Sequence, residues 1–488
     1  MGFANSIASG VRFCIPHAKR AFHESVFPLM NLKDTQTLRL EGHITPDQAW
    51  TYIDVPFEVP AGVGRLDVVY RYEAMIGSDP HLTGGNTIDI GIFDARGSGF
   101  SSPGYRGWSG SARDRFFISP AESTPGYMPG PIQPGTWHVT LGAYKVAANG
   151  CNYQIDVTFT PGPGDTAAFP PLLRLTNDEK GTYRPDEWLR GELHCHSTNS
   201  DGDSSVEEVV RLCEGLGLDF LAVMDHNNVT QRIDLARVET PLLLIPGYEV
   251  TMYYGHWNVW GDQGWIDFRV TNADDLARSI TEATARGFLA SCNHPKPFGP
   301  AWAFPQVEGY ACVEVWNGPW AGLNAFSLAF WTQRLDEGQR LVAVGGSDAH
   351  FHHKDHPAQL GQPCMFILPD GARSPAAVVA GLRKGHAFVT EAPDGPQLYL
   401  TSGAAMMGDV VPRPDDNRLP IAVQVVGGSG AMLEIHRRGG KVDRALVEGE
   451  DVVIERVMDV SDSSYVRVQL VAADGETVRA LTNPIYLD

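Results

Sequence analysis

The chain has 488 residues and a mass of 53.2 kDa, which is too long for one ordinary domain and predicts about three. A hydrophobic fraction of 43% with 20% charged residues is typical of a folded globular protein and excludes disorder as the main state. The 38 basic and 58 acidic residues give a formal net charge of −20. A surface this acidic repels nucleic acid and anionic membranes, so we expect neither as a partner.

Cysteine usage and hydropathy favour an intracellular protein. The seven cysteines are scattered and include no CxxC pair, which argues against a thiolate zinc site or a disulfide framework. The first twenty residues lack the continuous apolar stretch of a signal peptide, and no run reaches the roughly 18 apolar residues of a membrane helix. We therefore expect a cytoplasmic protein, and the sequence leaves a homo-oligomer open.

Alternating hydrophobic runs dominate the first third of the chain. After an N-terminal extension of residues 1–34, runs such as RLDVVYRYEA, TIDIGIFDA and YQIDVTFT predict strands across residues 35–165. Gly, Pro, Ser and Asn separate these runs, and helical periodicity is absent. We expect an all-β sandwich of the jelly-roll type, followed by the linker PGPGDTAAFPP.

Strands alternate with helices from residue 186 to residue 392. SSVEEVVRLCEGLG predicts a helix that begins with a capping box of Ser205 and Glu208, and runs such as FLAVMDHN and LVAVGGSDAH predict buried strands. Seven or eight such strands with helices between them predict a parallel sheet closed into a distorted β/α barrel. Residues 393–488 alternate again without helices and predict a small Ig-like sandwich.

Histidine, aspartate and glutamate recur where the predicted barrel strands end. HxH ends the first strand, DHN the second and PGYEV the third. NHP and GGSDAH end later ones, while His256 lies near the start of the GHWNVWG strand. Because the carboxyl ends of barrel strands meet on one face, we expect these side chains to gather there. The nine candidate ligands are His194, His196, Asp201, His226, Glu249, His256, His294, Asp348 and His350.

Imidazole and carboxylate ligands without thiolates indicate a centre of zinc, manganese or iron. Nine ligands are more than one ion can use, so we predict two or three divalent ions with Glu249 as a bridge. A water shared by such ions ionises near neutral pH and can attack as hydroxide. The ions would also attract an anionic substrate to an otherwise acidic protein.

The preferred hypothesis is therefore a metal-dependent hydrolase that cleaves a phosphomonoester or phosphodiester bond of a small molecule. Catalytic roles are assigned to Asp348, His226 and Glu249. A site built mainly from ions, with few specific contacts, favours promiscuity. GxGxxG, P-loop and GxSxG patterns are absent, which argues against nucleotide-dependent transfer and serine-based hydrolysis.

Four further residues lie close to the same strand ends. Lys296 in NHPKP is a candidate contact for a substrate anion, and Trp316 and Asn317 in EVWNG are candidates for lining the pocket. Asp225 precedes His226 and is a candidate either to orient it from outside the metal ligands or to cap the turn. Glu314 lies inside its strand, where a buried carboxylate behind the ligands is one interpretation, but it is assigned no role.

A family resemblance rests on these motifs taken together. ELHCHSTNSDG, MDHN, GYEV with GHWNVWG, NHP and GGSDAH resemble the successive motifs of the PHP (polymerase and histidinol phosphatase) superfamily. Within it, EVWNG and GGSDAH are similar to the carbaryl-hydrolase-like (CehA/McbA) branch of metallohydrolases. The resemblance covers residues 188–392 and implies a distorted seven-stranded barrel with up to three metals. It implies a first metal on His194, His196, Glu249 and Asp348, a second on Glu249, His256 and His294, and a third on Asp201, His226 and His350.

Three alternatives stay open at this stage. The same hydroxide can attack a carbonyl, and the carbaryl-hydrolase-like resemblance implies an aryl carbamate or a carboxylic ester as substrate. A binding protein built on an inactive barrel would keep its metals without turning over an ester. The amidohydrolase barrel also begins with HxH and ends with Asp, but it usually has a bridging lysine where this chain offers Glu249.

Overall fold

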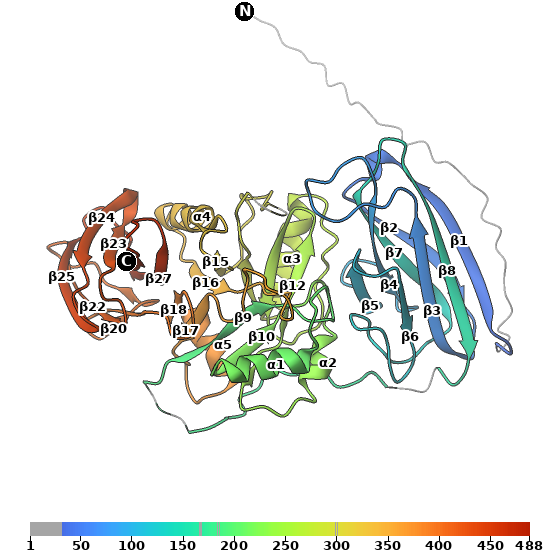
Figure 1. Cartoon of the computed structure of the whole chain (residues 1–488), viewed down its shortest axis with the longest axis horizontal. Coiled ribbons are helices and arrows are strands. Elements are labelled where there is room, and N and C mark those ends of the chain that lie inside the picture. Colours follow the sequence, from blue (N-terminus) through green and yellow to red (C-terminus); the bar gives the residue numbers. More distant parts are fainter. Residues whose placement is uncertain (1–31, 165–167, 183, 185, 298, 300) are drawn as a thin grey trace, which may run out of the picture.

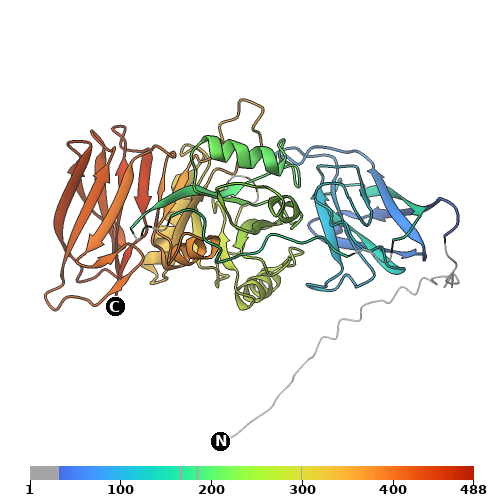
Figure 2. The same cartoon turned by 90° about the horizontal axis from the view of Figure 1, so that it is seen from below.

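Three regions follow one another along the molecule. The computed structural model describes residues 32–164, 168–182, 184, 186–297, 299 and 301–488, so most of the predicted N-terminal extension lies outside the described residues. A central α/β region lies between an N-terminal and a C-terminal β-rich region (Figures 1 and 2). The protein is a mixed α/β chain with many strands and few helices.

The N-terminal region is a sandwich of two four-stranded sheets, ordered β1-β8-β3-β6 and β2-β7-β4-β5. All neighbouring strands in both sheets are antiparallel. Along β8, Ile155, Val157 and Phe159 are buried while the residues between them are not, which is the alternation expected of a strand with one covered face. The strands are β1 Gln36–Ile44, β2 Tyr52–Val59, β3 Val63–Tyr72, β4 Thr87–Phe93, β5 Tyr105–Gly110, β6 Arg115–Ile118, β7 Gly135–Lys145 and β8 Cys151–Pro161.

The central region holds two sheets, ordered β12-β13-β14-β15-β16 and β11-β10-β9-β17-β18. Isolated parallel bridges join them, one from His226 to Glu249 and one from Cys195 to Ala349. The strands are β9 Leu189–Cys195, β10 Phe220–Val223, β11 Leu243–Leu244, β12 Gly247–Met252, β13 Gly255–Trp260, β14 Leu289–Cys292, β15 Cys312–Asn317, β16 Val342–Gly346, β17 Cys364–Ile367 and β18 Ala387–Thr390.

Five helices accompany these strands. The predicted capping box of Ser205 and Glu208 at the start of α1 is confirmed, with each side chain accepting the other residue's backbone N–H. Among the described residues, no helix combines the length and the apolar character that crossing a membrane requires. The helices are α1 Val206–Gly215, α2 Gln231–Leu235, α3 Ala273–Ala285, α4 Asn324–Asp336 and α5 Pro375–Lys384.

The central strands are not uniformly parallel, so that part of the prediction is wrong. β9, β10 and β11 run parallel, as do β14, β15 and β16, but β13 is antiparallel to both of its neighbours and β17 is antiparallel to β9 and β18. Only Tyr253 and Tyr254 connect β12 to β13, and a turn that short joins antiparallel strands. His256 near the start of β13 therefore lies at the same end as residues that follow the parallel strands.

The C-terminal region continues one of the central sheets. β18 pairs with β27, with Phe388 opposite Thr482 and Thr390 opposite Ala480. The strands β26, β23 and β24 follow β27 in the sheet. A second sheet, β20-β19-β22-β25, shares a hydrophobic core with it. The strands are β19 Gln397–Ser402, β20 Ala405–Met406, β21 Val410–Val411, β22 Arg418–Val426, β23 Met432–Arg437, β24 Lys441–Leu446, β25 Asp451–Asp459, β26 Tyr465–Val471, β27 Val478–Thr482 and β28 Ile485–Leu487.

Aromatic side chains join the N-terminal sandwich to the central region. Tyr52 stacks on Tyr253 with ring centroids 5.3 Å apart, and Trp108 packs against Phe268 at 4.7 Å. Beneath this layer the Tyr253 hydroxyl donates a 2.7 Å hydrogen bond to Oδ2 of Asp89 on β4, whose side chain is buried. Burial raises the pKa of Asp89 to about 7, although the tyrosine hydrogen bond acts in the opposite direction.

This pKa predicts a pH-dependent stability. The folded-state pKa of Asp89 lies above the unfolded value of about 3.8, so folding is more favourable when this carboxyl is protonated. The contribution of Asp89 to stability is therefore fully present below pH 4 and is lost as the pH rises through 7. A pKa unit corresponds to about 1.4 kcal/mol. The free energy of unfolding of Asp89→Asn, relative to that of the wild type, should therefore be a few kcal/mol greater at pH 8.5 than at pH 5. The measurement is the difference in unfolding midpoint between wild type and Asp89→Asn at the two pH values; a pH-independent difference would contradict it.

Candidate metal centre

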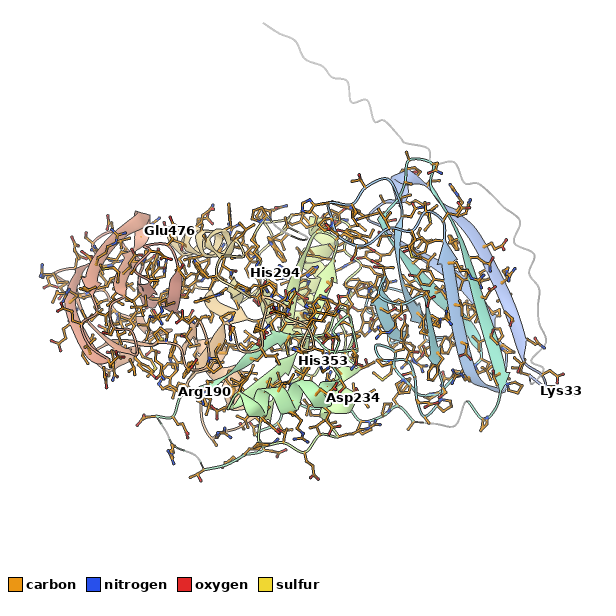
Figure 3. All side chains as sticks on the ribbon, viewed as in Figure 1. Lys33, Arg190, Asp234, His294, His353 and Glu476 are labelled. Carbon is orange, nitrogen blue, oxygen red and sulfur yellow. The ribbon has the colours of Figure 1, made fainter. Side chains whose placement is uncertain are left out.

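All nine predicted ligand residues gather at one end of the central region, and His294 marks their place between the two β-rich regions (Figure 3). They reach it from different elements. His194 belongs to β9, His226 follows β10, and Asp348 follows β16. Glu249 lies within β12 and not at its end, because β12 continues to Met252 and turns back into the hairpin.

The first group of ligand atoms surrounds the HxH motif. His196 Nε2 lies 2.9 Å from Asp348 Oδ1 and 3.2 Å from His194 Nε2. His194 Nε2 lies 3.4 Å from the same aspartate oxygen. These three ligand atoms all lie within 4.8 Å of one another, which is close enough for one metal ion. Both histidines are buried, whereas the Asp348 side chain is 25% exposed, so the group has one closed and one open side.

Glu249 is the centre of the whole cluster. Its side chain is buried, and Oε2 accepts no hydrogen bond from any described residue. Burial raises the pKa of this carboxyl, but the surrounding histidine charges outweigh burial and hold the pKa well below its usual range. Five histidines have a ring nitrogen 2.9–3.7 Å from a Glu249 oxygen: His194, His196, His226, His256 and His294.

An outer group lies at the exposed edge of the cluster. Asp201 Oδ1 lies 3.4 Å from His350 Nε2 and 3.6 Å from His226 Nε2, and His196 completes the group. Partial desolvation by the surrounding protein opposes ionisation of this half-exposed carboxyl, yet the two histidines hold the pKa of Asp201 at about 2. The pKa of His226 is raised to about 9, because the charges of Asp201 and Glu249 outweigh its desolvation. Acids and imidazoles in this group thus stabilise each other's charge.

The donor set fits divalent cations. His194 Nε2 faces His196 Nε2 at 3.2 Å, and His226 Nε2 faces His350 Nε2 at 3.4 Å. Two ring nitrogens this close need either one proton between them or a cation beside both. Neutral imidazole and carboxylate are ligands that zinc, manganese and iron accept. Together with the histidine nitrogens that converge on the buried Glu249 carboxylate, these contacts suit the binding of divalent ions at this position.

The distances regroup the ligand sets that the resemblance implies. His196 belongs both to the first group and to the outer group. His226 also joins Glu249 and His256 in a third group, in which ligand atoms lie within 4.8 Å of one another. His294 Nε2 lies 3.3 Å from Glu249 Oε1, beside this third group. The three groups therefore overlap and form one continuous cluster.

Two candidate ligands have left-handed backbone conformations, His294 with φ 28° and Asp348 with φ 51°. Such a conformation costs a non-glycine residue about 1–3 kcal/mol and persists only where the surroundings fix it. The Asp348 N–H donates to the His194 carbonyl at 2.7 Å, and the His294 N–H donates to Glu314 Oε2 at 3.2 Å. These bonds hold both side chains toward the cluster at the expense of backbone strain.

Glu314 and Glu192 support the cluster, and the sequence interpretation gave neither a role. Glu314 Oε1 lies 2.7 Å from His194 Nδ1, and despite burial its charge helps to raise the pKa of His194 well above its usual range. Glu192 accepts the backbone N–H groups of His194, Ser347 and Gly361 at 2.9–3.1 Å. The sequence feature that could have identified them is a charged residue inside a buried strand, as in CVEVWN. A buried charge is stable only where hydrogen-bond or ion-pair partners surround it.

Asp225 holds a loop, as the second of its two predicted roles implies. Its carboxylate accepts the Ser197 N–H at 2.8 Å and the hydroxyls of Ser197 and Ser200 at 2.6 Å. Among its described hydrogen bonds none joins it to His226, whose Nδ1 lies 2.6 Å from the Thr251 hydroxyl instead. Asp225 therefore fixes residues 197–200, immediately before Asp201.

The three predicted substrate contacts occupy different surroundings. Lys296 is buried and donates to the Asn317 carbonyl at 3.3 Å and to Asn317 Oδ1 at 3.1 Å. Asn317 in turn donates to Asp348 Oδ2 at 3.2 Å, so both residues adjoin the cluster. Trp316 belongs to the hydrophobic core and packs edge-on against Trp320, which favours a structural role for its ring.

The whole chain was compared with known protein families, curated proteins and solved structures. The chain matches no family model and no curated protein. Among solved structures it is similar to a Bacteroides vulgatus two-domain protein described as containing a "predicted PHP-like metal-dependent phosphoesterase". The two are 17% identical with a TM-score of 0.34, and the match covers 64% of this chain and 99% of the other. At this identity and TM-score, the similarity gives no information about function.

The contacts of Glu314 predict a role in metal affinity. Glu314→Gln places an amide where the carboxylate accepts the His294 and Asn317 N–H groups and removes the charge beside His194. We expect the affinity for the tightest-bound metal to fall about 10–100-fold, as measured by titration against a chelator. Exposed Glu337→Gln on the end of α4 is the matched control. Equal affinities in the two variants would contradict the assignment.

Proposed function

We propose that the protein is a metal-dependent hydrolase of the PHP type that cleaves a phosphomonoester or phosphodiester bond of a small molecule with two or three divalent ions. The observation that carries this proposal is the convergence of histidines and carboxylates on the buried Glu249 carboxylate. The architecture we propose for the central region is a distorted seven-stranded barrel. Its support is that the two isolated bridges would close β9, β10, β12, β13, β14, β15 and β16 into a ring.

The exposure of the ligands indicates how a substrate would approach. The side chains of His194, His196 and Glu249 are 0–1% exposed, whereas those of His226 and His350 are 20% exposed and that of Asp201 is 45% exposed. The buried residues form the floor of the cluster, and the exposed ones form its rim. A substrate therefore meets the cluster from the side of Asp348, His226, His350 and Asp201.

The ions, when bound, would activate an attacking water and neutralise the charge of phosphate oxygens. Asp348 lies at the boundary between floor and rim, with Oδ1 against His196 and Oδ2 accepting the Asn317 amide. We assign to Asp348 the acceptance of the proton from the attacking water. Glu249 keeps the histidine rings oriented through its charge. His226 lies at the rim, where it can face the leaving group.

Lys296 supplies a positive charge beside this boundary. Its ammonium group is buried, and burial lowers its pKa, although the charges of Glu314 and Asp348 act in the opposite direction. Asn317 links it to Asp348 through two hydrogen bonds. A buried ammonium held next to the reacting edge suits a substrate anion, which supports the phosphoester assignment over a neutral ester.

The deciding experiment compares reaction classes with one leaving group. The purified protein is loaded with manganese, zinc or iron and assayed with 4-nitrophenyl phosphomonoester, phosphodiester, carbamate and carboxylate substrates. Metal-dependent turnover of a phosphorus ester above the carbonyl esters supports the proposal. Preference for the carbamate or carboxylate would instead assign the alternative reaction, and bound metal without turnover of any ester would favour a binding protein.

Two variants test the ligand assignment. Glu249→Gln removes the charge that five histidines surround, so we expect loss of at least one metal equivalent and at least a 100-fold lower kcat/KM. His352→Ala is the matched control, because His352 follows His350 closely in sequence but belongs to no group of candidate ligands. Its metal content, measured by elemental analysis, should equal that of the wild type. Full activity and metal content in Glu249→Gln would overturn the assignment.

A further inference from the structure

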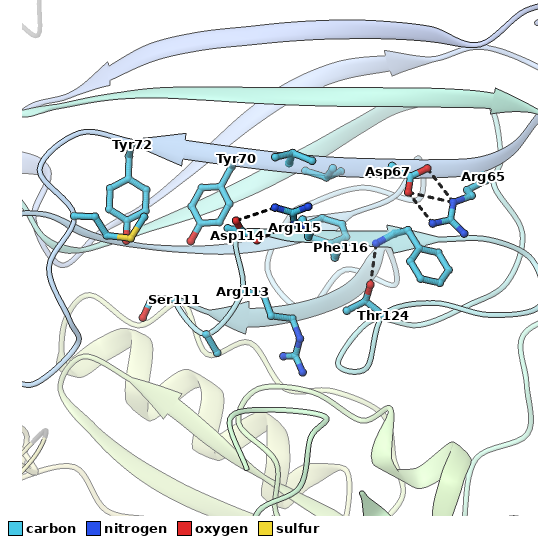
Figure 4. Close-up of a pocket in the computed structure, with 15 residues that line it drawn as sticks. Arg65, Asp67, Tyr70, Tyr72, Ser111, Arg113, Asp114, Arg115, Phe116 and Thr124 are labelled. Carbon is cyan, nitrogen blue, oxygen red and sulfur yellow. Dashed lines mark hydrogen bonds and ion pairs between the residues drawn. The ribbon is translucent and has the colours of Figure 1, made fainter. Parts of the chain in front are cut away.

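The N-terminal sandwich reaches the rim of the metal centre through the turn between β5 and β6. A cavity of about 760 Å³ lies on this sandwich, and Arg113 is one of the residues that line it. Figure 4 shows Arg113 pointing away from the strands toward the central region. Arg113 Nη1 donates to the Ser200 carbonyl at 2.9 Å, and Nη2 donates to the Thr198 carbonyl at 2.5 Å. One guanidinium from the sandwich therefore holds two carbonyls in the loop that precedes Asp201.

The neighbours of Arg113 do not compete for its guanidinium. Asp114 pairs with Arg115 at 3.0 Å, and both of these side chains are exposed. Arg113 is half-buried at the contact between the two regions. A planar guanidinium that donates to two carbonyls fixes both position and orientation, which a single point charge cannot do.

The loop held by Arg113 is also fixed from its inner side. Asp225 accepts the Ser197 N–H and the Ser200 hydroxyl, and within the loop the Gly202 N–H donates to the Ser197 carbonyl at 3.0 Å. Asp201, between Ser200 and Gly202, has the most exposed side chain among the carboxylates of the cluster. Its place in the outer group thus depends on a loop clamped by Asp225 on one side and Arg113 on the other.

Two more contacts from the sandwich bear on the outer group. The Gly126 N–H points at Asn199 Oδ1 and Thr230 Oγ1, at 3.3 and 3.2 Å. Gly126 has φ 91°, and a Cβ there would lie 2.5 Å from the Asn199 carbonyl, so this close approach requires glycine. The Tyr105 hydroxyl donates to the carbonyl of Asn227, the residue after His226.

The inner ligands are supported differently. His194 is held by Glu314 and Glu192, and Glu249 accepts the Asn293 amide at 2.9 Å, all within the central region. The sandwich contacts described above instead reach the loops that carry Asp201 and His226. The cluster therefore has an inner part that the central region supports and an outer part that a second region supports.

We propose that Arg113 is a positioning residue that fixes the Asp201 loop and so sets the occupancy of the outer metal site formed by Asp201, His226 and His350. The inference rests on the proposed metal centre but not on the identity of the ester that is cleaved. It makes the N-terminal sandwich a part of the metal site's construction. The inner ions should be independent of Arg113.

The test uses the full chain with Arg113→Gln, Arg113→Lys and the matched control Arg115→Gln. Metal stoichiometry and affinity are measured by elemental analysis and chelator titration with manganese and with zinc. We expect Arg113→Gln to lose about one metal equivalent or to bind its weakest metal about 10–100-fold less tightly. Arg115→Gln should match the wild type. Arg113→Lys should recover part of the loss, and added guanidinium should restore binding to Arg113→Gln.

Hydrogen exchange of the metal-free protein gives a second readout that needs neither ions nor turnover. We expect the backbone amides of residues 198–204 to exchange faster in Arg113→Gln than in Arg115→Gln, with the rest of the central region unchanged. Unchanged exchange together with wild-type metal binding would overturn the proposal, as would a wild type with no metal in the outer site. Failure of the proposed hydrolase activity alone would appear as intact metal binding without ester turnover, which is a separate result.

Discussion

The buried charge of Glu249 is the constraint on which the rest of this structure depends. A carboxylate removed from water is costly unless polar or oppositely charged groups surround it, and here five histidine rings do so, with the pKa values of His194 and His226 raised. Apart from His194 and His196, which share the HxH motif, each of those histidines arrives from a different part of the chain. The central region is therefore organised so that strand ends, a hairpin and several loops meet around one carboxylate.

The hairpin of β12 and β13 shows how this requirement shapes the fold. Had β12 been followed by a helix and another parallel strand, the start of the next strand would have lain at the opposite end of the sheet. A two-residue turn instead returns the chain at once and brings His256 within 3.4 Å of Glu249. The departure from a parallel sheet is thus the means by which this histidine reaches the site. Strain at His294 and Asp348 serves the same end on the strands that do run parallel.

Much of this arrangement could be predicted from the sequence because it follows from local patterns. Alternation predicted the strands of the two β-rich regions, and the capping box of Ser205 and Glu208 placed the start of α1. Strand-end spacing placed most of the candidate ligands together, since chain direction alone decides at which end of a strand a residue lies. Glu249, inside β12, and His256, near the start of β13, are the exceptions. The antiparallel direction of β13 was harder to predict, because the two turn residues, Tyr253 and Tyr254, are not the glycine or asparagine typical of a hairpin turn.

Long-range partners were beyond the reach of these patterns. Glu314 and Asp225 carry the same type of side chain, yet one holds His194 and the other a loop, and only tertiary pairing distinguishes them. The contact of Arg113 with Thr198 and Ser200 spans two regions of the chain, and no spacing rule connects them.

The division of the cluster into a buried floor and an exposed rim follows from how each part is stabilised. Floor residues can be held by buried carboxylates, since Glu192 and Glu314 lie among strands that exclude water. At the rim the substrate needs access, so a buried acid can hold the loop before Asp201 only from its inner side, as Asp225 does. Support for the outer side of the rim comes from the sandwich: Arg113, Tyr105 and Gly126 supply it without covering the 45% exposed Asp201 side chain. An open site with rigid outer ligands thus requires a second region beside the first, which gives a physical reason for the association of the sandwich with the metal centre.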